Sequence, residues 1–265
     1  MKKSRFLAIV LGITGFAILL PMAVMVLWSV TGRWPWPNLL PESYTLRTLQ
    51  ELLFGSAKLP EILFSSIWLA SVVAVLATIV GIMAARATEL YVFPGRSLIR
   101  AAEFLPLLVP GTVFATGIQL TMIRMGLSDT LWGVILVHLV VALPYCVTIM
   151  TDVTRAVGVR HEEQAAVLGA NPIRAFFLVT LPQLLPGILS SMSMGFILSY
   201  SQYFTTLMVG GGRIKTLALV LVPYIQSGDR ALSSVYSTVF VGSALLVFFI
   251  LEWAIKKTEK RGETR

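Results

Sequence analysis

The side chains that could carry chemistry are few and lie far apart. The chain of 265 residues has two histidines, His138 and His161, and a single cysteine, Cys146. One cysteine allows neither a disulfide framework nor a thiolate metal site. We find no catalytic triad, no metal-ligand cluster, no pair of carboxylates inside an apolar run and no G-x-x-x-x-G-K-[ST] phosphate loop. The sequence therefore predicts neither an enzyme nor a bound cofactor.

One polar stretch, residues 161–187, lies between two long apolar runs and reads HEEQAAVLGANPIRAFFLVTLPQLLPG. Glu163, Ala165, Ala166 and Gly169 fall on a helical repeat, with small residues where another surface could come close. Gly169 is a natural helix end, because glycine adopts a positive φ without a Cβ clash. We therefore expect a first short helix that ends at Gly169.

A second short helix should follow at once. Asn171 is a good N-cap, and Pro172 sits at the first helical position, where its missing N–H costs nothing. Arg174 marks the polar face of the next turns, and Pro182 lies at the start of the following apolar run. The stretch is predicted to be a helical hairpin at the membrane edge, presented to something outside the lipid.

This stretch resembles the cytoplasmic EAA loop of ATP-binding-cassette (ABC) importer permeases, which work with a soluble binding protein. The pattern is a Glu, an Ala or two, a Gly, and then Leu-Pro at fixed spacing, matched here by Glu163, Ala165, Gly169, Leu181 and Pro182. Gln164 stands where the family usually has Ala. In that family the loop forms a coupling helix that docks on the ATPase. The resemblance thus implies ATPase-coupling roles for Glu163, Ala165, Ala166, Gly169, Asn171, Pro172, Arg174 and Pro182. The alternative is an ordinary amphipathic connector.

The resemblance also implies an architecture and partners. The architecture would be the six-helix type I (MetI-like) permease, most similar to the polyamine, ferric and phosphonate types. The partners would be a second permease subunit, two ATP-binding subunits and a periplasmic or lipid-anchored solute-binding protein. ATP would be hydrolysed on a separate subunit, and this chain would lie in the bacterial cytoplasmic (inner) membrane.

The composition independently indicates an all-α polytopic membrane protein. Hydrophobic residues make up 56% of the chain and charged residues only 13%, whereas soluble domains carry about 25% charged residues. The net charge of +8 could suggest nucleic acid as a partner. The basic residues, however, cluster at the ends of apolar runs, as membrane topology requires. Membrane lipid, and not nucleic acid, is the expected surrounding.

Six apolar runs are long enough to cross the bilayer, since a helix needs about 20 residues to do so. They are residues 7–28, 62–85, 104–123, 130–151, 187–209 and 231–251. We divide the chain into an amino-terminal transmembrane helix (1–30), a periplasmic loop (31–61), a core (62–256) that contains the coupling loop (152–186), and a cytoplasmic tail (257–265).

Small residues along 62–85 predict close helix packing. Pro106 and Pro110 predict a broken third span that faces protein or a cavity.

The distribution of positive charge predicts the orientation. Fourteen of the 21 Lys and Arg residues fall on the side that holds both termini, the 86–100 loop and the 152–174 loop, and seven fall on the other side. The positive-inside rule places the richer side in the cytoplasm. The predicted outer side includes a polar loop at about 213–230.

Two ionisable residues in or near spans have structural interpretations. Glu103, at the end of the third span, is expected to pair with Arg100 or another loop arginine, although an ionisable residue at that depth can be functional. His138 is expected to be packed and hydrogen-bonded, and Cys146 to be a small core side chain.

A translocation path is predicted on the fifth span. At helical spacing, Ser201, Gln202, Thr205 and Met208 share one face. The segment resembles that of polyamine and ferric-type permeases, which often place an acidic residue where this chain has Ser201 and Gln202. Without a carboxylate the attraction for a cation is lost, so a neutral or anionic solute is favoured. The hydroxyls could instead bond to their own helix carbonyls and only help packing.

The alternative function is a stand-alone secondary transporter or channel. That class often has inverted repeats and charges at the midplane. The sequence has no convincing repeat and no acidic residue deep in a span. The permease subunit is therefore the favoured prediction.

Overall fold

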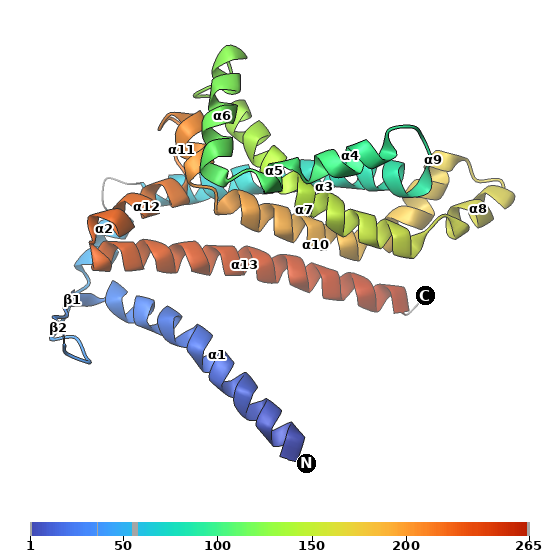
Figure 1. Ribbon diagram of the computed structural model, residues 1–265. Coiled ribbons are helices and arrows are strands. Elements are labelled where there is room, and N and C mark those ends of the chain that lie inside the picture. Colours follow the sequence, from blue (N-terminus) through green and yellow to red (C-terminus); the bar gives the residue numbers. More distant parts are fainter. Residues whose placement is uncertain (1, 36, 55–57, 264–265) are drawn as a thin grey trace. The chain divides into compact units, whose positions relative to one another are not determined.

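The computed structural model describes residues 2–35, 37–54 and 58–263, and the chain divides into two compact units. Figure 1 labels the helices and strands. One unit is built from Met1–Leu63 and Leu217–Ser243, the other from Phe64–Thr216 and Ala244–Arg265. Helices α3 (Leu59–Leu90) and α13 (Arg230–Glu263) each contribute residues to both units.

The first unit starts with the long helix α1 (Lys2–Ser29). The predicted periplasmic loop is structured, with an antiparallel hairpin of β1 (Thr31–Arg33) and β2 (Ser43–Tyr44), followed by α2 (Arg47–Phe54). The Trp28 and Trp34 rings stack with centroids 4.8 Å apart and join the end of α1 to the hairpin. The prediction of a polar loop at 213–230 is wrong in its middle, because the apolar run there forms α12 (Leu217–Ser227) and buries Leu217 and Leu221.

The second unit contains most of α3 and the series of helices that follow it as far as residue 210. Their bounds are α4 (Arg96–Glu103), α5 (Leu105–Leu108), α6 (Gly111–Arg124), α7 (Leu131–Val157), α8 (Arg160–Val167), α9 (Pro172–Ala175), the π-helix η1 (Phe176–Thr180), α10 (Leu181–Tyr200) and α11 (Phe204–Gly210). Helices α8 and α9 form a hairpin at one end of this unit, and α6 and α11 lie together at the other end (Figure 1).

Small residues let the helices of this unit approach closely, as the sequence predicted for residues 62–85. A Cβ on Gly81 of α3 would lie 3.1 Å from the backbone of Cys146 on α7. A Cβ on Gly195 of α10 would lie 3.1 Å from the Cα of Ala74. Close backbone packing replaces the hydrophobic driving force that helices lack in lipid. The sites predicted to pack are therefore the sites of contact.

Among the described residues, five helices are long and apolar enough to span a membrane: Ile9–Ser29, Leu59–Leu90, Leu131–Val157, Pro172–Tyr200 and Arg230–Lys257. The third predicted span is broken at Val109 and Pro110, between α5 and α6, as the prolines indicated. The fifth span was predicted to be continuous, and this is wrong, because residues 201–203 interrupt it. The all-α polytopic class is confirmed.

The structural interpretations of His138 and Cys146 are confirmed. Both side chains are buried in the second unit, and Cys146 belongs to its hydrophobic core. The His138 ring makes two hydrogen bonds, one between Nδ1 and Ser199 Oγ (2.9 Å) and one between Nε2 and Thr206 Oγ1 (3.0 Å).

Candidate coupling site and translocation path

The α8–α9 hairpin has the geometry that its sequence predicted. Gly169 has φ +86° and closes α8 with two backbone bonds, Gly169 N to Ala166 O (2.9 Å) and Ala170 N to Ala165 O (3.0 Å). This pair of bonds is the glycine-terminated helix end known as the Schellman motif. Asn171 Oδ1 then accepts from Arg174 N at 2.7 Å and caps α9, with Pro172 in its first turn. Only residues 168–171 separate the two helices of the hairpin.

Almost all of the predicted coupling residues are exposed. Ala165 is half-buried, and the other seven, Glu163, Ala166, Gly169, Asn171, Pro172, Arg174 and Pro182, are exposed. Three apolar side chains of the hairpin accompany them, with Val167 and Leu168 each 88% exposed and Ile173 70% exposed. Large exposed apolar side chains at the end of a hairpin are candidates for contact with a partner. We refer to Val167, Leu168 and Ile173 as the hairpin tip.

The opposite side of α8 is fixed by a carboxylate that sequence reasoning missed. Glu162 Oε1 lies 2.9 Å from Arg86 Nη1, and Arg86 Nη2 donates to Glu162 Oε2 at 3.0 Å. Thr180 of η1 donates to the same carboxylate, and the Arg86 guanidinium lies 4.9 Å from the centre of the Phe176 ring. This cluster ties the α8–α9 hairpin to the end of α3.

The pKa of the Glu162 carboxyl is consistent with its ion pair with Arg86. Burial raises the pKa of its carboxyl, but the hydrogen bonds from Arg86 and Thr180 lower it, and the net direction is downward. Glu162 is therefore ionised at neutral pH. The signal in the sequence was the pair Glu162–Glu163, because neighbouring helical residues point about 100° apart and only one of them can face inward.

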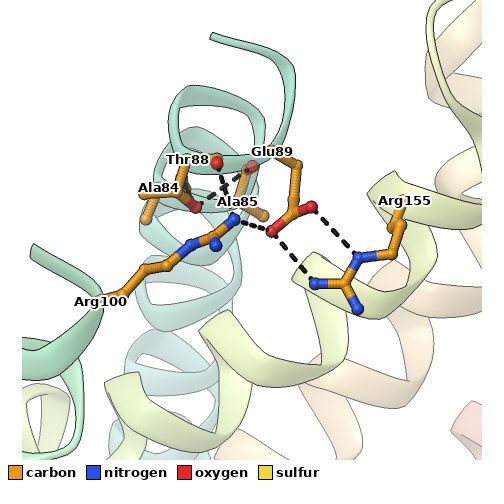
Figure 2. A network of polar contacts seen from close by, with 6 residues as sticks. All are labelled: Ala84, Ala85, Thr88, Glu89, Arg100 and Arg155. Carbon is orange, nitrogen blue, oxygen red and sulfur yellow. Dashed lines mark hydrogen bonds and ion pairs between the residues drawn. The ribbon is translucent and has the colours of Figure 1, made fainter. Parts of the chain in front are cut away.

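A second cluster lies one turn further along α3. Glu89, with 9% of its side chain exposed, lies between Arg100 of α4 and Arg155 of α7 (Figure 2). Arg155 donates from Nε (3.2 Å) and Nη2 (3.3 Å) to the Glu89 carboxylate, and Arg100 also donates to Thr88 O at 2.8 Å. One half-buried glutamate thus joins the ends of three helices.

The prediction that Glu103 pairs with Arg100 or another loop arginine is wrong. Arg100 is drawn to Glu89 and to the carbonyl at the end of α3, where the helix dipole also favours a cation. Among the described residues Glu103 makes no ion pair, and its Oε1 atom is buried without a hydrogen-bond partner. Burial raises the pKa of Glu103, although Arg100 acts in the opposite direction.

The predicted path residues do not share one face of a continuous helix, because α10 ends at Tyr200 and α11 begins at Phe204. Ser201 is exposed, Gln202 and Met208 are half-buried, and Thr205 is buried. Thr205 Oγ1 donates to Gln202 Oε1 at 2.9 Å. Ser201 Oγ donates to Leu198 O at 3.1 Å, which is the packing alternative for that hydroxyl. Gln202 and Thr205 are nevertheless in contact, through the hydrogen bond between their side chains.

Comparison with known proteins identifies the family. The family model of the binding-protein-dependent transport system inner membrane component matches residues 77–261. The chain is 26% identical to the putative 2-aminoethylphosphonate transport system permease protein PhnV of Salmonella typhi over 240 residues, which are 90% of each protein. It is 25% identical over 207 residues to the spermidine/putrescine permease PotC of Haemophilus influenzae, covering 78% of this chain and 80% of that one.

Two further similarities agree with this. The molybdate/tungstate permease WtpB of Pyrococcus abyssi is 29% identical over 167 residues, which are 63% of this chain and 66% of that protein. A bacterial ABC transporter involved in the import of the acidic polysaccharide alginate has the same fold, with a TM-score of 0.71, 14% identity, and 94% and 95% of the two chains covered.

The family match includes the α8–α9 hairpin, both charged clusters and the broken fifth span, and it extends over more than half of the chain. A stand-alone transporter or channel is therefore set aside. The chain belongs to the family of binding-protein-dependent transport system inner membrane components, and it is the multi-pass membrane permease, not an enzyme, of an ABC importer that works with an ATPase and a solute-binding protein.

Proposed function

We propose that this permease is coupled to its ATPase through the hairpin tip and the exposed residues around it, from Glu163 to Arg174. The observation that carries the proposal is the exposure of Val167 and Leu168 at 88% each, on a hairpin held rigidly from behind by the Arg86–Glu162 pair. An apolar tip on a fixed base can enter a groove and transmit force. The positive-inside rule places this hairpin and both termini in the cytoplasm.

We also propose the full assembly that the EAA resemblance implies. It has two ATP-binding subunits, a second permease subunit and a periplasmic or lipid-anchored binding protein. Closure of the two ATPase subunits would move the two coupling hairpins together, and the clusters around Arg86 and Glu89 would pass that motion to α3, α4 and α7.

The coupling proposal is tested at Gly169, whose φ of +86° is suited to glycine or asparagine. Gly169→Glu adds a bulky charge at the tip and strains the turn, whereas Gly169→Asn keeps the turn and is the matched control. Glu163→Lys is paired with Glu163→Gln in the same way. We expect normal membrane abundance in all four variants, with loss of ATPase co-purification only in Gly169→Glu and Glu163→Lys. Full ATPase binding by both of these would contradict the proposal.

We further propose that the solute is neutral or anionic and passes the break at Ser201 and Gln202. No carboxylate occurs in residues 199–212, and Arg213 and Lys215, which follow, are exposed. Exposed cations steer anions toward a site at low salt. The phosphonate and molybdate relatives are named for anion-bearing solutes and so favour this view, whereas the polyamine relatives oppose it.

Three solutes serve as probes of this proposal: 2-aminoethylphosphonate, molybdate and putrescine. We expect the assembled transporter with its binding protein to take up one of the first two, or neither, but not putrescine. In a transporter that imports a probe, Gln202→Leu and Thr205→Val should lower uptake at least fivefold, while the control Ser190→Ala, on the exposed side of α10, should not. Putrescine import would overturn the charge argument, and normal uptake by both path variants would overturn the route.

A further inference from the structure

The break in the fifth span has a backbone that few intrahelical bonds support. Tyr200 ends α10 and Phe204 begins α11, so residues 201–203 lie between two helix ends. Two backbone bonds close α10, from Ser201 N to Ile197 O (3.1 Å) and from Gln202 N to Ser199 O (3.2 Å). Such a break is tolerated at membrane depth only where protein or a water-filled cavity supplies polar partners. Some neighbouring group must therefore hold α10 and α11 in this geometry.

His138 of α7 contacts both sides of the break. Its Nδ1 atom lies 2.9 Å from Ser199 Oγ in the last turn of α10, and its Nε2 atom lies 3.0 Å from Thr206 Oγ1 in the first turn of α11. The imidazole is 1% exposed, and Ser199 and Thr206 are 3% and 0% exposed. One buried ring therefore bridges two helices through two neutral hydroxyls.

The hydrogen bonds also define the tautomer of the ring. Thr206 Oγ1 donates its proton to Gln202 O at 2.8 Å, so toward His138 it can only accept. The Nε2 atom must therefore carry a proton. A buried ring with only neutral partners is neutral, so Nδ1 is bare and accepts from Ser199. His138 thus acts as a donor toward α11 and an acceptor toward α10.

The far end of α11 is held separately. Asp129 N donates to Val209 O at 2.8 Å, and Val209 is fully buried. A Cβ on Gly210 would lie 3.3 Å from the Val134 side chain on α7. With this end fixed on the α6–α7 side, the first turn of α11 is the part that needs a separate attachment. His138 supplies it, in the same turn that bonds to Gln202 through Thr205 and Thr206.

We infer that His138 is a positioning residue that pins α11 to α10 and so sets the conformation of residues 201–203 in the fifth span. It makes no contact with solute. It acts through Ser199 and Thr206, and it fixes where Gln202 points. That Gln202 lies on the solute route rests on the proposed function, whereas the pin itself does not.

Hydrogen exchange measured by mass spectrometry on the purified, assembled transporter tests the pin without any solute. His138→Leu removes both hydrogen bonds. Thr206→Val removes the bond to Nε2, together with the Thr206–Gln202 bond, and nearly keeps the shape of the side chain. His138→Gln is the conservative variant, because its amide can donate to Thr206 from near the position of Nε2. Residues 139–157 of α7 and 181–196 of α10 serve as internal references.

We expect exchange of residues 199–207 to become at least tenfold faster in His138→Leu and Thr206→Val, to stay within about threefold of wild type in His138→Gln, and to be unchanged in the reference segments. Unchanged exchange at 199–207, or an equal rise in the references, would overturn the pin and leave His138 as an ordinary packing residue. If His138→Leu does not assemble, Thr206→Val and Ser199→Ala carry the same comparison.

The outcome can be separated from that of the proposed route. Faster exchange at 199–207 together with normal uptake by Gln202→Leu would support the pin and contradict the route. Unchanged exchange together with impaired uptake by Gln202→Leu would support the route and contradict the pin.

Discussion

Glu162 and Glu163 are adjacent glutamates that point to different sides of α8, one half-buried and one exposed. The EAA pattern singled out Glu163, which is exposed on the outer face of α8. Glu162 faces inward, where Arg86 and Thr180 bind its carboxylate and Phe176 packs on the guanidinium. From the sequence alone, Arg86 was only one of several basic residues at the end of a span, with no partner indicated. Its distance from Glu162 in the sequence is why residue patterns alone did not reveal the pair.

We predict that Glu162→Gln and Arg86→Met each loosen the coupling hairpin. A hydrogen bond to a charged group contributes about 1.5–3 kcal/mol, and both side chains are less than a quarter exposed. Each variant should therefore lower the apparent Tm of the purified transporter and weaken ATPase co-purification. The reversed pair, Arg86→Glu with Glu162→Arg, should recover part of both losses. Equal behaviour of the reversed pair and the single variants would count against a direct interaction.

The same pair predicts a dependence on pH. Because the folded-state pKa of Glu162 is lowered, its stabilising contribution is complete above the unfolded-state value, about 4.3, and is lost as the pH falls through the folded value. The difference in Tm between wild type and Glu162→Gln should therefore be constant near neutral pH and shrink below about pH 4. A difference that persists unchanged in acid would mean that the charge of Glu162 is not what stabilises the hairpin.

At the scale of the element, the helices were largely predictable from the sequence, but only one of the two helix breaks was. The apolar runs, the cap at Asn171 and the turn at Gly169 were all readable, because each depends on local backbone preference. The proline break before α6 was readable for the same reason. The break at residues 201–203 was not, because no proline or glycine marks it and buried side chains of α7 and α11 hold it in place. The π-helix η1 and helix α12 were missed as well, since both depend on packing.

The π turn should be necessary for the hairpin. A π-helix contains one extra residue relative to an α-helix, and here it presents Phe176 to Arg86 and Thr180 to Glu162. Deleting Leu178, whose side chain is 64% exposed, should restore an α-helix and rotate α8 and α9 by about 100° relative to α10. We expect normal membrane abundance with loss of ATPase co-purification. Leu178→Ala keeps the register and is the control; wild-type binding in the deletion variant would show that the π turn is dispensable.

At the scale of the whole molecule, composition and charge distribution gave the class, and one motif gave the family. They could not give the arrangement of subunits, because residues that contact another chain look like residues that contact lipid. Helix α1 is the clearest case. Its apolar window contains no buried residue, and its Trp28 end is joined to the β1–β2 hairpin by ring stacking. Between Ile9 and Ser29 the surface of α1 is largely apolar, as contact with lipid or with a second permease requires.

We predict that α1 packs on the second permease subunit and contributes to assembly, not to the solute route. A photo-crosslinking residue is placed in turn at seven exposed positions of α1, Leu7, Ile9, Leu11, Ile13, Phe16, Ile18 and Leu19. Contact with one partner helix should give capture of the partner permease at positions that recur every three or four residues, since these share a helix face. The remaining positions serve as matched controls and should give only lipid adducts. Capture within the same chain alone, or lipid adducts at all seven positions, would show that α1 is not an assembly helix.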